Sequence, residues 1–388
     1  MKKIFVYSLF LFISFSMFSQ ELQKKFIKGN IGDKITAVRE STGEESVWLT
    51  NQALNFVLEN KSYIGNDREL DGLSVAAVLS ITPEYTRNLN NSEKSELLNK
   101  LIKIFSEFQD SNTVQIAIIT KIVSLDSFIS TQAFLSILNN YLLEVQPQTA
   151  DSDILKTVIT SVGKIGDNIS FTILYNDLND RRYTEYYPEI EDAIINLIPS
   201  SRNEVLQIVH SKDVTQVNKI LNLIQKNPTI SQNFLSEIAE NILIETILMM
   251  GNSSEITELV ELQTYSFKIL NDNRWTRASD TALSFFAAAK TEYNEEIMTE
   301  DQFVSIITSL VNIAPVDSVN PLIKYLGELN SQVERGQNVS QSIVLAVINT
   351  LGAIGDKSAF DSLLSVTYLD YSESVLSAAR KALAGLRW

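Results

Sequence analysis

The feature that most constrains the fold is a match, without a gap, between two distant stretches of the chain. Residues 162–174, VGKIGDNISFTIL, correspond to the first thirteen residues of LGAIGDKSAFDSLL at 351–364. The offset that places Gly163 on Gly352 also places Ala193 on Ala382 and Leu197 on Leu386, within the longer stretches 154–197 and 343–386. Weaker matches precede each copy by about 40 residues. A recurrence of roughly this period predicts a chain of stacked repeats, each contributing two helices.

The apolar residues recur at helical spacing throughout the chain. Four segments show the three-and-four spacing that places apolar side chains on one face of a helix, at residues 46–60, 94–108, 213–227 and 374–386. The alternation typical of strands is hard to find. We therefore expect an all-α superhelix of about eight or nine helical hairpins, because the chain has that length at this period.

The glycines and the aspartate of the matched stretch have an architectural interpretation. Gly352 lacks a side chain, which lets a neighbouring helix approach closely, and Gly355 can take the left-handed conformation that ends a helix. Asp356 can accept backbone N–H groups as the N-cap of the next helix. That helix is expected to bury Phe360, Leu363 and Leu364. The corresponding turn of the earlier copy contains Gly163, Gly166 and Asp167.

Two further inferences follow from this turn. A catalytic role for Asp167 or Asp356 is the less favoured alternative, because capping explains both their position and their recurrence. The tetrapeptide IGDK at residues 31–34 repeats residues 354–357, so we expect it to start the first helix in the same way.

At LGAIGDKSAFDSLL through VLSAARKALAGL the sequence resembles HEAT repeats, particularly the bacterial subgroup named after phycobilisome lyases. The clearest repeats are residues 113–198 and 300–388, whereas residues 200–290 show helices without a visible period. The resemblance implies a HEAT- or armadillo-like α-solenoid. It implies no particular function, because such solenoids include scaffolds, receptors, chaperone-like proteins and occasional enzymes.

The N-terminal residues have the pattern of a secretory signal peptide. Lys2 and Lys3 precede an apolar and hydroxyl-rich run over residues 4–18, and small Ser19 stands before Gln20. We expect residues 1–19 to be removed and residues 20–388 to form one solenoid domain. The alternative, an uncleaved membrane anchor, would need about 20 apolar residues, and this run is shorter. The expected location is the periplasm, the cell surface or the medium.

Composition restricts how the exported chain is stabilised and what it binds. The sequence contains no cysteine, so disulfides cannot contribute and a large buried core must stabilise the fold. Without Lys2 and Lys3, 30 basic residues face 47 acidic ones, a formal charge of −17. Such a surface repels phosphate backbones, which argues against a nucleic-acid partner. No later stretch is apolar enough to predict a transmembrane segment.

The sequence offers few residues suited to catalysis. His210 is the single histidine and lies at the expected end of a helix. Neither a metal site nor a serine triad has supporting spacing around it, and the adjacent acidic pairs are typical of solvated helix faces. We therefore predict no catalytic, metal or cofactor residues, and no enzymatic activity.

Two segments carry more arginine and aromatic side chains than a solvated turn requires. Arginine, tyrosine and tryptophan are enriched in binding hot spots. The candidate partner-binding residues are Arg181, Arg182, Tyr183, Tyr186 and Tyr187 in the first segment, and Arg274, Trp275 and Arg277 in the second. The alternative is that these aromatic residues cover the edge of the core and the arginines pair with nearby acids.

The resulting functional hypothesis is an exported repeat scaffold that binds a protein or peptide along its concave face. Stacked units would supply successive inner helices to one long surface without a specialised active site. Two alternatives stay open at this point. One is a hydrolase or lyase that uses carboxylates, and the other is a structural component of the cell envelope.

Overall fold

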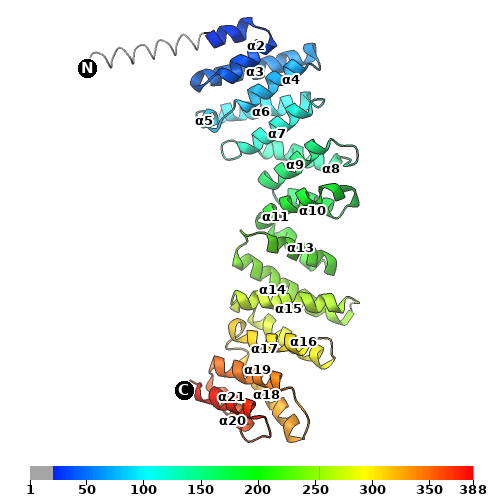
Figure 1. The fold of residues 1–388 in the computed structure, drawn as a ribbon, viewed down its shortest axis with the longest axis vertical. Helices are drawn as coiled ribbons and strands as arrows, with labels where there is room; N and C mark the ends of the chain where they lie inside the picture. The colour runs from blue at the N-terminus through cyan, green and yellow to red at the C-terminus, as the bar shows by residue number, and fades with distance from the viewer. Residues whose placement is uncertain (1–20, 253, 388) are drawn as a thin grey trace, which may run out of the picture. The chain divides into compact units, whose positions relative to one another are not determined.

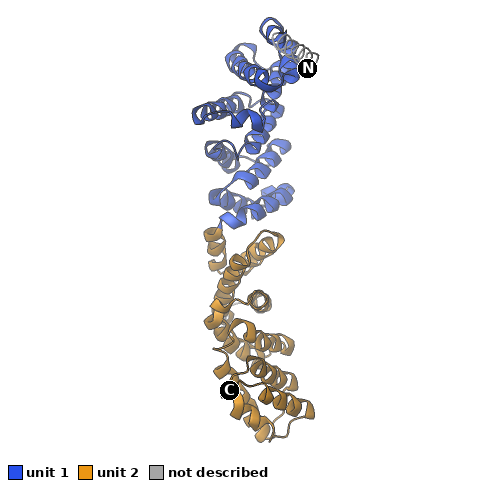
Figure 2. Cartoon of the chain, turned by 90° about the vertical axis from the view of Figure 1, so that its left-hand side faces the viewer, with its two compact units in different colours: residues 1–201 blue, residues 202–388 orange. Residues whose placement is uncertain are grey.

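The computed structural model describes residues 21–252 and 254–387. The signal-peptide prediction for residues 1–19 falls outside these residues. The chain divides into two compact units, residues 1–201 and residues 202–388 (Figure 2). Both consist of helices, and no β-strand occurs in the described part of the chain, where Asp356 and Arg387 form an isolated bridge. The single domain expected over residues 20–388 stays a prediction.

The first unit is built from two layers of helices (Figure 1). Helices of one layer contact one another in succession: α2 (Ile31–Glu40), α4 (Arg68–Leu79), α7 (Asn112–Ser124), α9 (Ser152–Ile165) and α11 (Tyr187–Leu197). The other layer contains α3 (Gly43–Ile64), the short α5 (Pro83–Arg87), α6 (Asn91–Glu107), α8 (Gln132–Glu144) and α10 (Asn168–Leu178). A 3-10 helix, η1 (Arg181–Tyr186), joins α10 to α11, and η2 (Ile198–Ser200) ends the unit.

The second unit repeats this plan. Its first layer contains α13 (Val214–Lys226), α15 (Ile256–Asp272), α17 (Glu300–Ile313), α19 (Gln341–Ile354) and α21 (Glu373–Ala384). Its second layer contains α12 (Arg202–His210), α14 (Gln232–Met249), α16 (Ser279–Asn294), α18 (Val319–Glu334) and α20 (Phe360–Val366). Three 3-10 turns complete it, η3 (Met250–Asn252), η4 (Thr276–Ala278) and η5 (Lys357–Ala359). A second-layer helix packs against the first-layer helix that follows it, as α10 does with α11 and α20 with α21. The predicted all-α helical repeat is confirmed.

Short polar residues define where many of the helices begin. The carboxylates of Asp67, Asp151 and Asp167 each accept two backbone N–H groups at the starts of α4, α9 and α10. Asn30 and Asn90 form capping boxes with residues three positions later. Such caps satisfy N–H groups that have no partner within the helix.

The two matched glycines occupy equivalent positions, as predicted. Gly163 lies three residues before the C-cap of α9, and Gly352 lies three residues before the C-cap of α19. A Cβ atom on Gly163 would lie 2.6 Å from Cα of Ala193 on α11, and one on Gly352 would lie 3.0 Å from Cα of Ala382 on α21. Since Ala193 and Ala382 are related by the same offset as the two glycines, the sequence match reflects the same close helix contact in both units.

The turns that follow these glycines differ at one residue. Gly355 takes the expected left-handed conformation, with φ of 75°. Gly166 is extended, with φ of −72° and ψ of 173°, and a Cβ atom there would lie 2.8 Å from Cβ of Ser170. Glycine is therefore required at position 166 because a side chain would not fit, and at position 355 because φ is positive. Asp167 and Asp356 both cap, although Asp356 caps η5, which leads into α20.

Two expectations about this motif are wrong. Residues 31–34 lie inside α2, which is capped by Asn30, and Asp33 completes the capping box from the third helical position. The N-cap role therefore falls on the asparagine before the tetrapeptide. Leu363 is buried as expected, but Phe360 and Leu364 are only half-buried, because α20 belongs to the last hairpin of the described residues and no described helix packs over its outer face.

Unequal repeats explain why residues 200–290 show no period. Helices α12, α14, α16 and α18 begin at Arg202, Gln232, Ser279 and Val319, so the steps between successive starts differ widely. Helix α14 has 18 residues and α15 has 17, against 9 in α12. A fixed offset cannot align hairpins of such different length, although the packing plan is unchanged.

Candidate functional site

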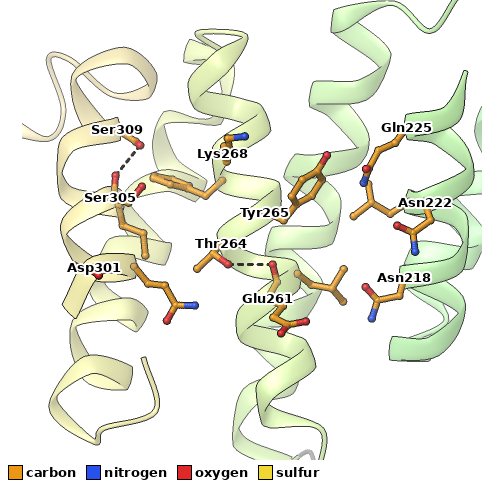
Figure 3. A pocket seen from close by; sticks show the side chains of 15 residues that line it. Asn218, Asn222, Gln225, Glu261, Thr264, Tyr265, Lys268, Asp301, Ser305 and Ser309 are labelled. Carbon is orange, nitrogen blue, oxygen red and sulfur yellow. Dashed lines mark hydrogen bonds between the residues drawn. The ribbon is translucent and has the colours of Figure 1, made fainter. Parts of the chain in front are cut away.

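The first layer of the second unit carries an open groove of about 610 Å³ (Figure 3). Its polar wall residues come from three successive first-layer helices. They are Asn218, Asn222 and Gln225 on α13, Glu261, Thr264, Tyr265 and Lys268 on α15, and Asp301, Gln302, Ser305 and Ser309 on α17. The spacing of three or four residues on each helix places these side chains on one face.

Several wall side chains are not used by the fold. Asn218, Asn222 and Gln225 make no side-chain hydrogen bond with any residue in the described part of the chain. Glu261 and Asp301 likewise form no ion pair there. By contrast, the hydroxyl of Thr264 donates to the main-chain oxygens of Val260 and Glu261. The hydroxyl of Ser309 donates to the main-chain oxygen of Ser305. The amides and carboxylates are therefore free to bind another molecule.

The groove has an apolar floor beneath a polar, solvated wall. Leu221, Leu262, Phe267 and Ile306 are buried at its base. Tyr265 is 37% exposed, and Figure 3 shows its ring lying between α15 and α13. Burial and the charge of Asp272 raise its pKa, so its hydroxyl stays protonated and can donate. Sites for small molecules are concave and mostly apolar, whereas this solvated groove suits a longer ligand.

Charge is distributed unevenly along the groove. Glu261 and Asp301 lie at one end together with Asn218, and Lys268 lies at the other end together with Gln225 (Figure 3). All three charged side chains are exposed. The groove thus has an acidic end and a basic end, which can orient a ligand that carries charge.

The equivalent layer of the first unit carries a second groove, of about 650 Å³. Hydroxyl side chains of α7 and α9 dominate its wall: Thr120, Ser124, Thr157, Thr160 and Ser161. Lys156 is paired with Glu189, at 3.3 Å from Nζ to Oε1, whereas Lys164 is exposed. The first layer therefore presents a polar groove in each unit, with different chemistry.

The tyrosines predicted to bind a partner belong mainly to the core of the first unit. Tyr183 and Tyr186, on η1, are 2% and 3% exposed and contact each other edge to face. The hydroxyl of Tyr183 lies 3.4 Å from the main-chain oxygen of Leu142. Tyr187 is half-buried, and its hydroxyl donates to the main-chain oxygen of Asp180. Tyr183 and Tyr186 are therefore too buried to offer the exposed side chains that partner binding needs, because η1 folds them against the hairpin before it. A partner-binding role for half-buried Tyr187 stays a prediction.

The two arginines of this segment are exposed. Nη2 of Arg182 lies 2.6 Å from Asp180, and its Nη1 donates to Gln146. The side chain of Arg181 makes no hydrogen bond or ion pair with the described residues, whereas its main-chain oxygen accepts from the hydroxyl of Thr184. One arginine therefore pairs locally, and only Arg181 presents an unused charge.

A buried carboxyl group lies beside this segment. Burial, together with the negative charge of Asp180, raises the pKa of Asp177 to about 7, and Arg182 only partly opposes this. Oδ2 of Asp177 is buried and has no hydrogen-bond partner in the described structure. The group is therefore sensitive to pH near neutrality.

The second predicted segment, residues 274–277, lies in the link between α15 and α16, which includes η4. Trp275 is half-buried, and its Nε1 donates to Oε2 of Glu240 on α14 at 2.8 Å. Arg277 lies over the indole ring, 5.3 Å from its centroid. Arg274 is exposed and has a φ of 50°. Trp275 thus ties the link between α15 and α16 to α14, while both arginines stay exposed. Their role in partner binding stays a prediction.

The remaining candidate for chemistry is His210, which ends α12 as expected. Its Nε2 lies 3.2 Å from Oδ1 of Asn241, and the imidazole is exposed. Within residues 21–252 and 254–387, no group of three histidine or acidic side chains is arranged to hold a metal ion. In the same residues, no helix is both long enough and apolar enough to span a bilayer.

The layers and grooves define an α-helical repeat protein, with first-layer helices that present variable polar side chains. No family model matches the chain, and no curated protein matches it in sequence.

Sequence reasoning missed the groove residues. In DVTQVNKILNLIQKN the apolar positions predict a helix, whereas Asn218, Asn222 and Gln225 on the opposite face match no known motif. The usable signal was a row of amides on a helix where solvated faces usually carry lysine and glutamate.

Proposed function

We propose that the chain is an exported, HEAT-like repeat protein that binds another protein through the groove on α13, α15 and α17, without catalysis. The observation that carries the proposal is the row of side-chain amides of Asn218, Asn222 and Gln225, which have no hydrogen-bond partner among the described residues and lie beside exposed Tyr265. Binding surfaces of repeat proteins arise in this way, because stacked units bring equivalent helix faces together.

The HEAT-like assignment and export have separate support. The former rests on the equivalent contacts of Gly163 with Ala193 and of Gly352 with Ala382. The latter rests on Lys2, Lys3 and the apolar run over residues 4–18. Together they favour a binding protein of the periplasm, the cell surface or the medium.

Partner capture tests the proposed function. The partner should be isolated by cross-linking from the cell envelope and its affinity for the purified chain then measured. Tyr265→Ala should weaken binding at least tenfold, as truncation of a tyrosine hot spot does. The matched control, Tyr368→Ala, removes an 80% exposed tyrosine outside the groove and should leave affinity unchanged.

Two results would contradict the proposal. One is equal partner affinity for Tyr265→Ala and the parent chain. The other is turnover of a glycan or small molecule by the pure protein, which would favour an enzyme on a solenoid scaffold.

A further inference from the structure

We propose that the groove of the second unit binds a peptide segment in extended conformation, with the peptide main chain running along α13 and α15. The segment carries a lysine or arginine at the end lined by Glu261 and Asp301. This inference rests on the proposed function and adds the conformation and charge of the bound segment.

The spacing of the amides matches an extended main chain. Asn218 and Asn222 are four residues apart on α13, which is about 6 Å along the helix axis. In an extended peptide, groups that point the same way recur every second residue, which is about 6.6 Å. Two successive main-chain groups on one side of the peptide can therefore meet these two side chains.

The chemistry of the wall also suits a main chain. A side-chain amide both donates and accepts, as each peptide unit does, so it can bind main-chain N–H and C=O groups together. Gln225 extends the row by one turn, and its longer side chain offsets the shorter step of three residues. All three amides lack a partner among the described residues, so binding breaks no hydrogen bond of the fold.

The opposite wall sets the length and charge of the segment. Glu261 and Lys268 are seven residues apart on α15, about 10 Å along its axis, which corresponds to roughly three extended residues. Glu261 and, on the neighbouring α17, Asp301 provide two unpaired carboxylates at one end of the groove (Figure 3). They favour a cationic side chain of the peptide at that end. The net charge of −15 for the whole chain further disfavours an acidic segment. Tyr265, midway along the wall, can pack against the peptide between these ends.

The probe for the test is a phage-displayed library of random octapeptides, selected on the full chain. A peptide that is selected is labelled, and its Kd is measured by fluorescence polarisation. Selected sequences should contain lysine or arginine at a fixed position. The double variant Asn218→Ala/Asn222→Ala should raise Kd at least tenfold. The control Asn233→Ala, an exposed amide at the start of α14, should not.

Two further measurements separate main-chain from side-chain recognition. Methylation of single peptide nitrogens removes one N–H without changing a side chain, and it should raise Kd at least tenfold at alternate positions. The double variant Glu261→Lys/Asp301→Lys should reverse the preference from basic to acidic residues. Glu334→Lys, which changes an exposed acid at the end of α18, should leave the preference as it is.

The outcomes distinguish this inference from the proposed function. Selected peptides that tolerate methylation at every nitrogen, or that bind the amide double variant normally, overturn the extended main-chain inference. The inference is also overturned if the library yields no binders, or if the groove binds glycans instead, while Tyr265→Ala still abolishes capture of a protein partner. In that case the proposed function stands. If Tyr265→Ala leaves protein capture unchanged, the proposed function itself fails.

Discussion

Gly163 and Gly352 are residues at which one absent atom decides how closely two helices approach. Each faces an alanine backbone on the next first-layer helix, at a separation too short for a Cβ atom to fit without a shift. The pairing of glycine with alanine at the same offset in both units explains why these positions match in sequence. Close contact in the first layer therefore depends on specific small residues rather than on apolar character alone.

Substitution of Gly163 tests this contact. Gly163→Ala should lower the free energy of unfolding by about 1–3 kcal/mol, because α9 and α11 must separate to admit a methyl group. Gly327→Ala is the matched control, since a Cβ atom on Gly327, inside α18, would meet nothing within 4 Å. That control should raise stability by up to about 1 kcal/mol through helix propensity. Urea unfolding followed by circular dichroism measures both, and equal effects would contradict the account.

Asp177 makes stability depend on pH. Its pKa is raised from 3.8 to about 7, so the folded chain holds this proton more tightly than the unfolded chain. Its contribution therefore favours folding at low pH and is lost as pH rises from about 4 to 7. Asp177→Asn should be more stable than the parent chain at pH 8, and the difference should shrink toward pH 4. Glu185→Gln, an exposed acid on η1, is the control, and an identical pH profile for parent and Asp177→Asn would contradict the assignment.

At the scale of elements, η1 shows how a segment rich in binding-type residues can serve the core. The link between α10 and α11 turns Tyr183 and Tyr186 inward against the preceding hairpin. The corresponding link between α20 and α21 has no such element. One of its two tyrosines, Tyr371, donates its hydroxyl to Asn330 of the preceding hairpin, and the other, Tyr368, is 80% exposed.

Truncation of Tyr183 tests the structural role of η1. Tyr183→Ala should lower the free energy of unfolding by about 3–5 kcal/mol, as loss of a buried aromatic side chain does. Arg181→Ala, on the same element but exposed, should change it by less than about 0.5 kcal/mol. Thermal unfolding of the two variants shows whether Tyr183 belongs to the core or to a binding surface. A Tyr183→Ala chain as stable as the parent would restore the binding interpretation.

Sequence could predict the helices because each apolar stripe and each cap is local. The helices expected over 46–60 and 213–227 correspond to α3 and α13, the latter capped by Asp213. The direction in which the side chains of a turn point is not determined by the local sequence. Whether Tyr183 points into the core depends on the hairpin before it, which no spacing within residues 180–192 reveals. The groove was missed for the same reason, since its walls come from three helices far apart in sequence.

At the scale of the whole molecule, a repeat plan with shared packing leaves the exposed first-layer positions free to vary. Amides and Tyr265 line the groove of one unit, whereas hydroxyls and Lys164 line that of the other. Variation of surface chemistry on constant packing is the property that suits repeat proteins to binding.

Export is tested by the mass of the native protein. The proposed leader predicts a mature chain that begins at Gln20, because Ser19 is the small residue before the cleavage point. Intact-mass spectrometry of protein from its native cells measures this directly. A native chain that retains Met1 would contradict cleavage and favour a membrane anchor.

The central claim is that the groove on α13, α15 and α17 is the surface that meets a partner. Site-specific photo-cross-linking in the native cells tests it most directly, with a benzophenone amino acid placed at Tyr265. Tyr63, which is 88% exposed and belongs to the first unit, provides the matched position outside the groove. We predict a discrete, higher-mass adduct with one partner protein from position 265 and none from position 63. Adducts from position 63 alone, or equal adducts from both positions, would contradict the claim.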